Sequence, residues 1–143
     1  MTQEIFAALE QRFNANPTLV TVGRKLLQGF DEQRDVNIIG AHTEVNIDKT
    51  GTNLGTWDSD IDEWDLRFKF HSKDLRTISA ELWLGAMRAM FKDANLSSYA
   101  FHCCGVREAA LSAPRNKDSA YDAAIRFLMT VQWRVNSPVV RYA

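Results

Sequence analysis

Residues 125–135 have the sequence IRFLMTVQWRV, in which every second residue is apolar. The residues between are mostly polar, and the apolar ones are Ile125, Phe127, Met129, Val131, Trp133 and Val135. Successive side chains of a β-strand point to opposite faces, so a period of two predicts a half-buried antiparallel strand. A shorter copy lies upstream, where Trp64, Leu66, Phe68 and Phe70 alternate with Asp65, Arg67 and Lys69.

Two amphipathic helices are predicted around these strands. Residues 2–14 place Ile5, Phe6, Leu9 and Phe13 on one face, and the helix should stop before Pro17. Ser72 or Asp74 can cap a second helix that runs to about Asp93. Its expected apolar stripe consists of Leu75, Ile78, Leu82, Ala86 and Ala89, widened by Trp83, Met87, Met90 and Phe91.

Further strands are expected at residues 19–22, 36–48 and 99–111, the second of them bent near Gly40. Its predicted anchors are Ile38, Ile39, Val45 and Ile47. Residues 50–62 join two strands and are expected to form a long, mobile hairpin loop. The predicted fold class is therefore α+β, an antiparallel sheet of about four long strands with two helices packed on one face, in a single domain over residues 1–143.

Composition excludes several classes of function. The chain has 143 residues, 45% of them hydrophobic and 24% charged, with a formal net charge of −1. These values are those of an ordinary globular domain, and they favour neither nucleic-acid nor membrane binding through bulk charge. No apolar run reaches the roughly 18 residues that a membrane span needs, and the acidic, amphipathic start of the chain is unlike a signal peptide.

The two cysteines, Cys103 and Cys104, are adjacent. A disulfide between neighbours on a strand would strain the backbone, and the sequence has no third cysteine. This usage predicts two structural thiols in a reducing compartment.

The acidic segment Asp58, Asp60 and Asp62 resembles the opening of a calcium-binding EF-hand loop. That loop needs glycine for its sharp turn and a bidentate acid at its twelfth position. Here Glu63 and Lys69 occupy those two places, so a solvated acidic loop is predicted instead.

His102, Cys103 and Cys104 supply zinc-ligand atom types, but contiguous strand residues cannot all turn toward one ion. His42 and His71 would have to converge from elsewhere in the fold. A nucleophilic cysteine needs an electropositive, partly exposed setting, which a mid-strand position beside Phe101 does not offer. We therefore expect no catalytic residues, no cofactor and no metal, and the chain is not expected to be an enzyme.

Long strands with modest helical cover suggest an interface. Two helices can cover one sheet face, which leaves the other face and the sheet edges free for a partner. Arg67, Lys69, Arg126 and Arg134 lie on the polar sides of strands and are candidates for a sheet-face contact. Trp57 in the acidic loop is either packed locally or an interface anchor. These features motivate the hypothesis of a symmetric ring.

The sequence resembles the tail terminator, or tail completion, proteins of long-tailed bacteriophages. The resemblance covers nearly the whole chain and depends on the pattern of elements. The segments that carry it are LVTVGRKL at residues 19–26, the strand at 36–47, the alternating strand 64–70 before the helix at 75–91, and the hairpin from FHCCGV at 101–106 to residues 125–133.

The resemblance implies a structural protein without enzymatic activity or cofactor. Members form a ring, expected to be a homohexamer, on the head-proximal end of the tail tube, where they end tube polymerisation and present the surface for head joining. The implied partners are the tail tube protein, a head-completion or neck protein, and DNA that passes through the lumen unread. The implied location is the virion tail, and the host cytoplasm during assembly.

Alternatives stay open. Trp57, Asp58, Asp60 and Asp62 could face the lumen and repel phosphate, or the loop could order on docking to the tube. The chain could be another neck or head–tail joining protein. A third alternative is a small ligand-binding α+β domain with a cavity lined by Trp83, Met87, Met90 and Phe91.

Overall fold

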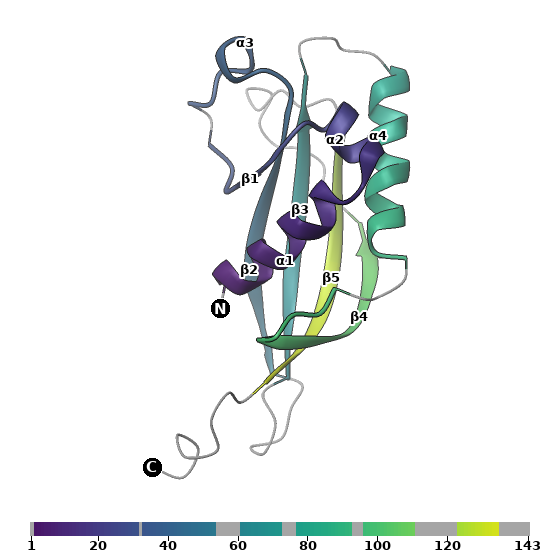
Figure 1. The fold of residues 1–143 in the computed structure, drawn as a ribbon. Coiled ribbons are helices and arrows are strands. Elements are labelled where there is room, and N and C mark those ends of the chain that lie inside the picture. The colour runs from purple at the N-terminus through teal and green to yellow at the C-terminus, as the bar shows by residue number, and fades with distance from the viewer. Residues whose placement is uncertain are drawn as a thin grey trace.

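A five-stranded sheet organises the molecule (Figure 1). The computed structural model describes residues 2–31, 33–53, 61–72, 77–92, 96–110 and 123–134. The spatial strand order is β1-β2-β3-β5-β4, and the strands are β1 (Leu26–Gln28), β2 (His42–Asn53), β3 (Ile61–His71), β4 (Phe101–Ala109) and β5 (Ala123–Trp133). β1 runs parallel to β2, and the four long strands are antiparallel to their neighbours. The predicted α+β class is confirmed.

Helices cover one face of the sheet. α1 (Thr2–Asn14), α2 (Pro17–Val22) and α4 (Thr77–Met90) pack there, with α2 between α1 and α4. The short helix α3 (Val36–Ile39) lies on the other side of the sheet from α4 (Figure 1). The helical face therefore contains the core, and the segment around α3 covers one end of the opposite face.

The alternating strands place their apolar residues in that core, as predicted. Trp64, Leu66, Phe68 and Phe70 of β3 are buried, as are Ile125, Phe127, Met129 and Val131 of β5. Trp83 of α4 is fully buried, stacks on Phe70 at 5.6 Å between ring centroids, and donates its Nε1–H to Thr43 Oγ1 at 3.0 Å. This contact joins α4 to the start of β2.

The prediction of a strand at residues 19–22 was wrong, because these residues form α2. Asn16 caps the helix, since its side-chain oxygen accepts from the backbone N–H groups of Thr18 and Leu19. Pro17 occupies the first helical position, where its missing N–H is not needed. These two local signals outweigh the β-branched composition.

The strand expected over residues 36–48 was also wrong in its first part. Residues 36–39 form α3, Gly40 adopts φ +86°, and β2 begins only at His42. A positive φ suits glycine and lets the chain turn from α3 into the strand. Ile38, one of the predicted anchors, is 83% exposed, whereas Val45 is fully buried.

The buried face of α4 is rotated from the predicted one. Leu82 is 51% exposed and Ala89 is exposed, while Trp83, Met87 and Met90 lie in the core. The residues treated as the margin of the stripe are thus its centre. The proposed caps and the first part of the stripe fall partly outside the described residues, at 73–76.

Residues 50–53 and 61–62, predicted as parts of a hairpin loop, belong to strands, because β2 extends to Asn53 and β3 begins at Ile61. Residues 54–60, including Trp57, Asp58 and Asp60, lie outside the described residues. Among the helices that the structure describes, none is long and apolar enough to cross a membrane.

Candidate functional site

The sheet face opposite α4, called the open face here, carries mostly polar side chains. It is formed by the strand positions that alternate with the core residues, among them Asn46, Asp48, Glu63, Asp65, Arg67, Lys69, Arg126, Thr130 and Gln132. Three of the four predicted basic interface residues lie on this face. The fourth, Arg134, is exposed just after β5, and its backbone N–H donates to Ala100 O at 2.9 Å.

Asp65 neutralises two of these arginines. Arg67 and Arg126 lie directly opposite each other on β3 and β5, an arrangement that two like charges disfavour. Asp65, only 6% exposed, accepts from Arg126 Nε at 2.9 Å and from Arg67 Nε at 3.2 Å. The hydrogen bond with Asp65 raises the pKa of Arg126. The guanidinium groups are thus paired within the chain and do not form a free cationic patch.

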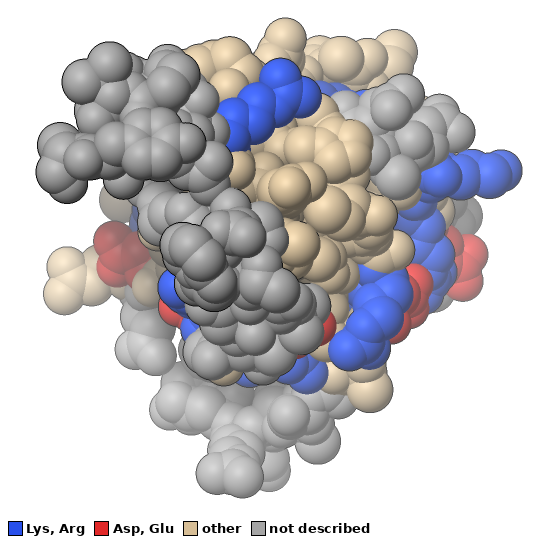
Figure 2. All heavy atoms as spheres, turned by 90° about the horizontal axis from the view of Figure 1, so that it is seen from below, with Lys and Arg blue, Asp and Glu red and all other residues tan. Residues whose placement is uncertain are grey.

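Lys69 also has a partner, because its ammonium lies 4.4 Å from the centroid of the Phe30 ring. Figure 2 views the molecule from below and shows Lys and Arg side chains beside Asp and Glu, with uncharged residues between them. A surface of mixed sign does not favour tight binding to a nucleic-acid backbone.

Asp62 is not a residue of a solvated loop. It lies in β3, is 5% exposed and accepts the Nε1–H of Trp133 at 3.0 Å. Lys49 Nζ lies 3.5 Å from its other oxygen. Asp62 therefore holds the ends of β2, β3 and β5 together, a role that separates it from Asp58 and Asp60, which fall outside the described residues.

β4 forms one edge of the sheet, with β5 as its strand neighbour. Ser97 and Ser98 bond to its first residues: the backbone N–H of Cys103 donates to Ser97 Oγ, and that of Ser98 donates to Phe101 O. Tyr99, just before the strand, is 79% exposed. The exposed side chains of β4 are His102, Cys104, Arg107 and Glu108.

The two cysteines differ in setting. Cys103 is buried and Cys104 exposed, with a β-bulge between Cys103 and Gly105. Burial raises the pKa of the Cys103 thiol, which opposes thiolate formation. The geometry thus supports a structural thiol at Cys103, whereas Cys104, the second of the two predicted structural thiols, is exposed.

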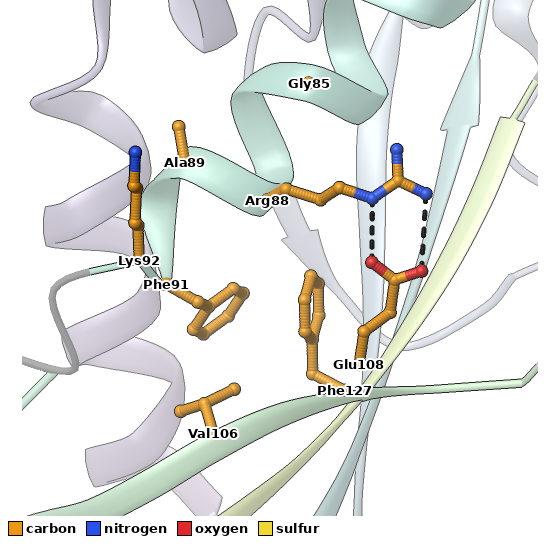
Figure 3. A pocket seen from close by; sticks show the side chains of 8 residues that line it. All are labelled: Gly85, Arg88, Ala89, Phe91, Lys92, Val106, Glu108 and Phe127. Carbon is orange, nitrogen blue, oxygen red and sulfur yellow. Dashed lines mark hydrogen bonds and ion pairs between the residues drawn. The ribbon is translucent and has the colours of Figure 1, made fainter.

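A groove of about 520 Å³ lies between α4 and the β4–β5 edge (Figure 3). Phe91 and Phe127 face each other at 4.3 Å between ring centroids, with Val106 of β4 beside them. Arg88 of α4 reaches across to Glu108 of β4, donating from Nε at 2.7 Å and from Nη2 at 3.3 Å. The groove is thus continuous with the β4 edge.

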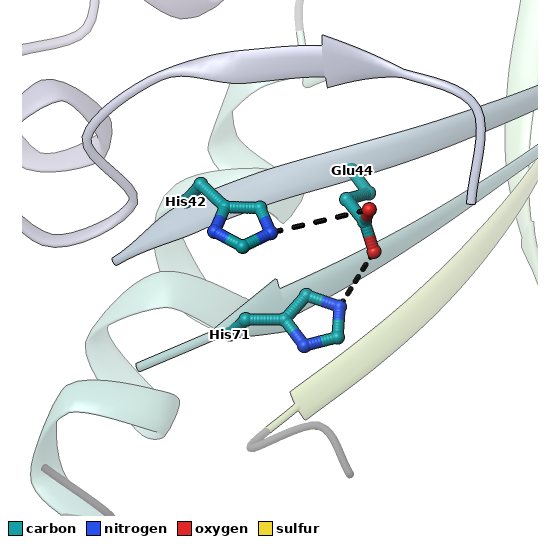
Figure 4. A group of neighbouring side chains, drawn as sticks. All are labelled: His42, Glu44 and His71. Atoms are coloured by element: carbon teal, nitrogen blue, oxygen red, sulfur yellow. Dashed lines mark ion pairs between the residues drawn. The ribbon is translucent and has the colours of Figure 1, made fainter. Parts of the chain in front are cut away.

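A second cluster of ionisable groups lies on the open face where β2 begins and β3 ends (Figure 4). His42 and His71 are register partners on β2 and β3, and their rings stack at 4.9 Å between centroids. Glu44 projects between them, with Oε1 2.6 Å from His71 Nε2 and Oε2 3.9 Å from His42 Nε2. His42 and Glu44 are 1% and 3% exposed. Burial lowers the pKa of His42.

The segment between β1 and α3 closes over Glu44. Arg34 donates from Nη1 to Glu44 Oε2 at 2.5 Å and from Nη2 to Gln28 O at 2.9 Å. The backbone N–H of Asp31 donates to the same Oε2 at 3.3 Å. The carboxylate is therefore fixed from the side away from His71.

Sequence reasoning mentioned His42 and His71 but did not bring Glu44 into the group. The spacing His-x-Glu on a strand places His42 and Glu44 on one face, which is a signal that could have been used. The third member depends on the β2–β3 register, which the sequence alone does not fix.

No protein-family model matches the sequence, and no curated protein matches it.

Proposed function

We propose that this chain is a structural subunit that assembles through the β4 edge into a ring, of the kind that the tail terminator proteins form on phage tail tubes. In this role it ends tube polymerisation and offers a surface for head joining. It performs no catalysis, and DNA passes through its ring without being read.

The observation that carries the proposal is that both edges of the sheet have stretches without a strand partner. On one side the three-residue β1 pairs only with Thr43, Glu44 and Val45 of β2, and within the described residues no strand pairs with the outer edge of β2 at 46–53. On the other side lies the nine-residue β4, and within the described part of the chain no strand pairs with its outer edge. Ser97 and Ser98 already bond the outward groups of Cys103 and Phe101, so the free part of this edge follows Cys103. A long free edge is a template for another chain. A head-to-tail contact made by two different surfaces generates a closed ring when its rotation closes, and an open filament otherwise.

Two further features suit the β4 edge to a partner. Tyr99 is an exposed aromatic side chain beside the start of the strand, and aromatic residues are enriched among interface anchors. The groove lined by Phe91, Phe127 and Val106 adjoins the other end of the strand and offers apolar surface to a partner. The β-bulge and the Arg107 and Glu108 charges oppose indiscriminate edge-to-edge aggregation.

The charge distribution suits a lumen through which DNA slides. The net charge is −1, and the Arg67 and Arg126 guanidinium groups are held by Asp65. Binding to phosphates grows with the number of free cations that neutralise them. A face whose cations are paired within the chain therefore binds a nucleic-acid backbone weakly.

The ligand-binding alternative depends on a cavity lined by Trp83 and its neighbours on α4, and most of these side chains are instead packed in the core. Trp83, Met87 and Met90 are at most 3% exposed and pack in the core, whereas Phe91, 7% exposed, borders the groove between α4 and β4. The groove in Figure 3 shares only Phe91 with the four residues of that alternative, and a salt bridge between half-exposed side chains crosses it.

The proposal is tested by the mass of the protein in solution, measured by sedimentation velocity alone and mixed with a tail tube protein. The experiment includes reducing agent, because Cys104 is exposed. Two variants address the edge, Tyr99→Ala and Cys104→Lys, since lysine on an edge strand discourages pairing. Leu82→Lys is the matched control, because it adds a charge at an exposed site on α4.

We expect a closed oligomer, alone or with the tube protein, and association weakened about tenfold or more in both edge variants. The Leu82 variant should assemble like the unmodified chain. A protein that stays monomeric under both conditions would overturn the proposal. Equal weakening by the Leu82 variant would remove β4 as the interface.

A further inference from the structure

His42, Glu44 and His71 bring together three groups of the kinds that bind transition metals. Their nearest ligand atoms all lie within 4.8 Å of one another. Both histidines present Nε2 to the Glu44 carboxylate, from opposite strands of one hairpin (Figure 4). The arrangement is independent of the β4 edge and of the assembly role.

The hydrogen bond of His42 fixes which ring nitrogen is free. Nδ1 lies 2.9 Å from Gly40 O, and a carbonyl oxygen can only accept, so Nδ1 carries the hydrogen. In the neutral ring Nε2 then has a lone pair, directed at the carboxylate of Glu44. A backbone carbonyl that holds the distal N–H is the usual outer partner of a metal-ligating histidine.

The contact between His71 and Glu44 lacks a hydrogen bond. His71 Nε2 lies 2.6 Å from Glu44 Oε1, yet this buried nitrogen has no hydrogen-bond partner in an acceptable direction. His71 Nε2 is therefore left without a hydrogen-bond partner, although the Glu44 carboxylate accepts from Arg34 and the Asp31 N–H. A cation among the three groups would give His71 Nε2 a partner, because each group can donate a lone pair to it.

We propose that His42 Nε2, His71 Nε2 and Glu44 bind one Zn²⁺ ion, with a fourth, non-protein ligand such as water. Two histidines and one carboxylate are an established zinc ligand set. Tetrahedral bonds of about 2.1 Å separate ligand atoms by about 3.4 Å, so small side-chain rotations from the observed separations suffice.

The surroundings of Glu44 are those of an oriented ligand. Arg34 and the Asp31 N–H both bond Oε2, which leaves Oε1 for the metal. Such outer partners fix the direction of a ligating carboxylate. Arg34 also balances the buried carboxylate in the metal-free chain.

The metal would tie the start of β2 to the end of β3. Because it binds the folded chain, saturating Zn²⁺ should raise the melting temperature, by about 5–10 °C at a hundredfold excess over Kd. Mg²⁺, which prefers oxygen ligands in octahedral geometry, should have no comparable effect.

The test titrates chelator-treated protein with Zn²⁺ by calorimetry and follows the ring nitrogens by long-range ¹H–¹⁵N NMR. We expect one Zn²⁺ per chain, and shifts of Nε2 in His42 and His71. His71→Gln should lower the affinity by more than about tenfold. His102→Gln is the matched control, because His102 is the third histidine, is exposed on β4 and should not affect binding.

Three results would overturn the proposal: no stoichiometric Zn²⁺ binding, NMR shifts confined to His102, or equal loss of affinity in the His71 and His102 variants. Circular dichroism checks that the His71 variant folds. The NMR measurement on the unmodified chain decides the question even if that variant does not fold.

Discussion

Replacing Thr43 by valine should destabilise the protein through a single buried hydroxyl group. Thr43 Oγ1 accepts the Nε1–H of fully buried Trp83 at 3.0 Å and donates to Gly23 O at 3.3 Å. Valine has nearly the same shape but leaves the Trp83 Nε1–H without this acceptor, whereas Gly23 O keeps the N–H of Lys25 at 2.9 Å. A buried polar group left unpaired costs about 1–3 kcal/mol.

For a chain of this length that loss corresponds to a melting temperature lowered by roughly 3–10 °C. Chemical denaturation should show a lower midpoint with an unchanged slope, because the extent of the fold is the same. Thr43→Ser is the matched control, since it keeps the hydroxyl group and loses one methyl group, worth about 0.8 kcal/mol.

A double-mutant cycle with Trp83→Phe isolates the hydrogen bond, because phenylalanine keeps an aromatic ring and removes the donor. The coupling between the two positions should be about 0.5–3 kcal/mol. The reasoning is refuted if Thr43→Val is as stable as Thr43→Ser, or if the coupling is zero.

Three further changes test other parts of the structure by chemical denaturation. Gly23→Ala should cost about 1–3 kcal/mol, because the added Cβ would lie 2.7 Å from Thr43 Oγ1. Gly85→Ala should stabilise the protein by about 0.5–1 kcal/mol, because Gly85 lies in a helix with open space around its Cβ position. A change in stability of the same sign for both variants would contradict this reasoning. Asp65→Asn should cost about 1–2 kcal/mol by weakening two half-exposed arginine contacts, and a neutral result would mean that these contacts contribute nothing. The hydrogen bond from Arg88 lowers the pKa of Glu108, so this exposed pair should stabilise the fold above about pH 4.5 and lose that effect as the pH falls through the lowered pKa. Glu108→Gln should therefore cost under about 0.5 kcal/mol at neutral pH and nothing in acid. A loss of stability that grows in acid would exclude this contribution of the pair.

Strong local periodicity made the long strands predictable. Phe68 and Ile125 are register partners, and both belong to alternating segments whose apolar faces were correctly placed in the core. The first helix was predicted at its observed bounds because its apolar spacing and the stop signal at Pro17 indicate the same helical segment. In these segments pattern and packing favour the same structure.

The failures occur where local signals compete. Residues 19–22 have strand-like composition, but a capping asparagine and a proline at the first turn start a helix. In residues 36–39 the apolar pair Ile38 and Ile39 suggested a strand, yet Gly40 turns the chain and Ile38 faces solvent. Tertiary context and backbone geometry decide such short segments.

The functional surfaces were predictable only in part. The sequence placed Arg67 and Arg126 on a polar face, but not opposite each other around Asp65. It also gave no register between His42 and His71, on which the proposed zinc site depends. Contacts between strands far apart in sequence require the register, which short patterns do not determine.

The proposed tail-terminator role is tested most directly by electron microscopy of particles made by a phage that carries this gene with an early stop codon. The account predicts overlong or ragged tail tubes beside DNA-filled heads that lack tails. Tails of normal length that fail to join heads would assign the protein to the neck instead. Normal infectious virions would contradict the structural role altogether.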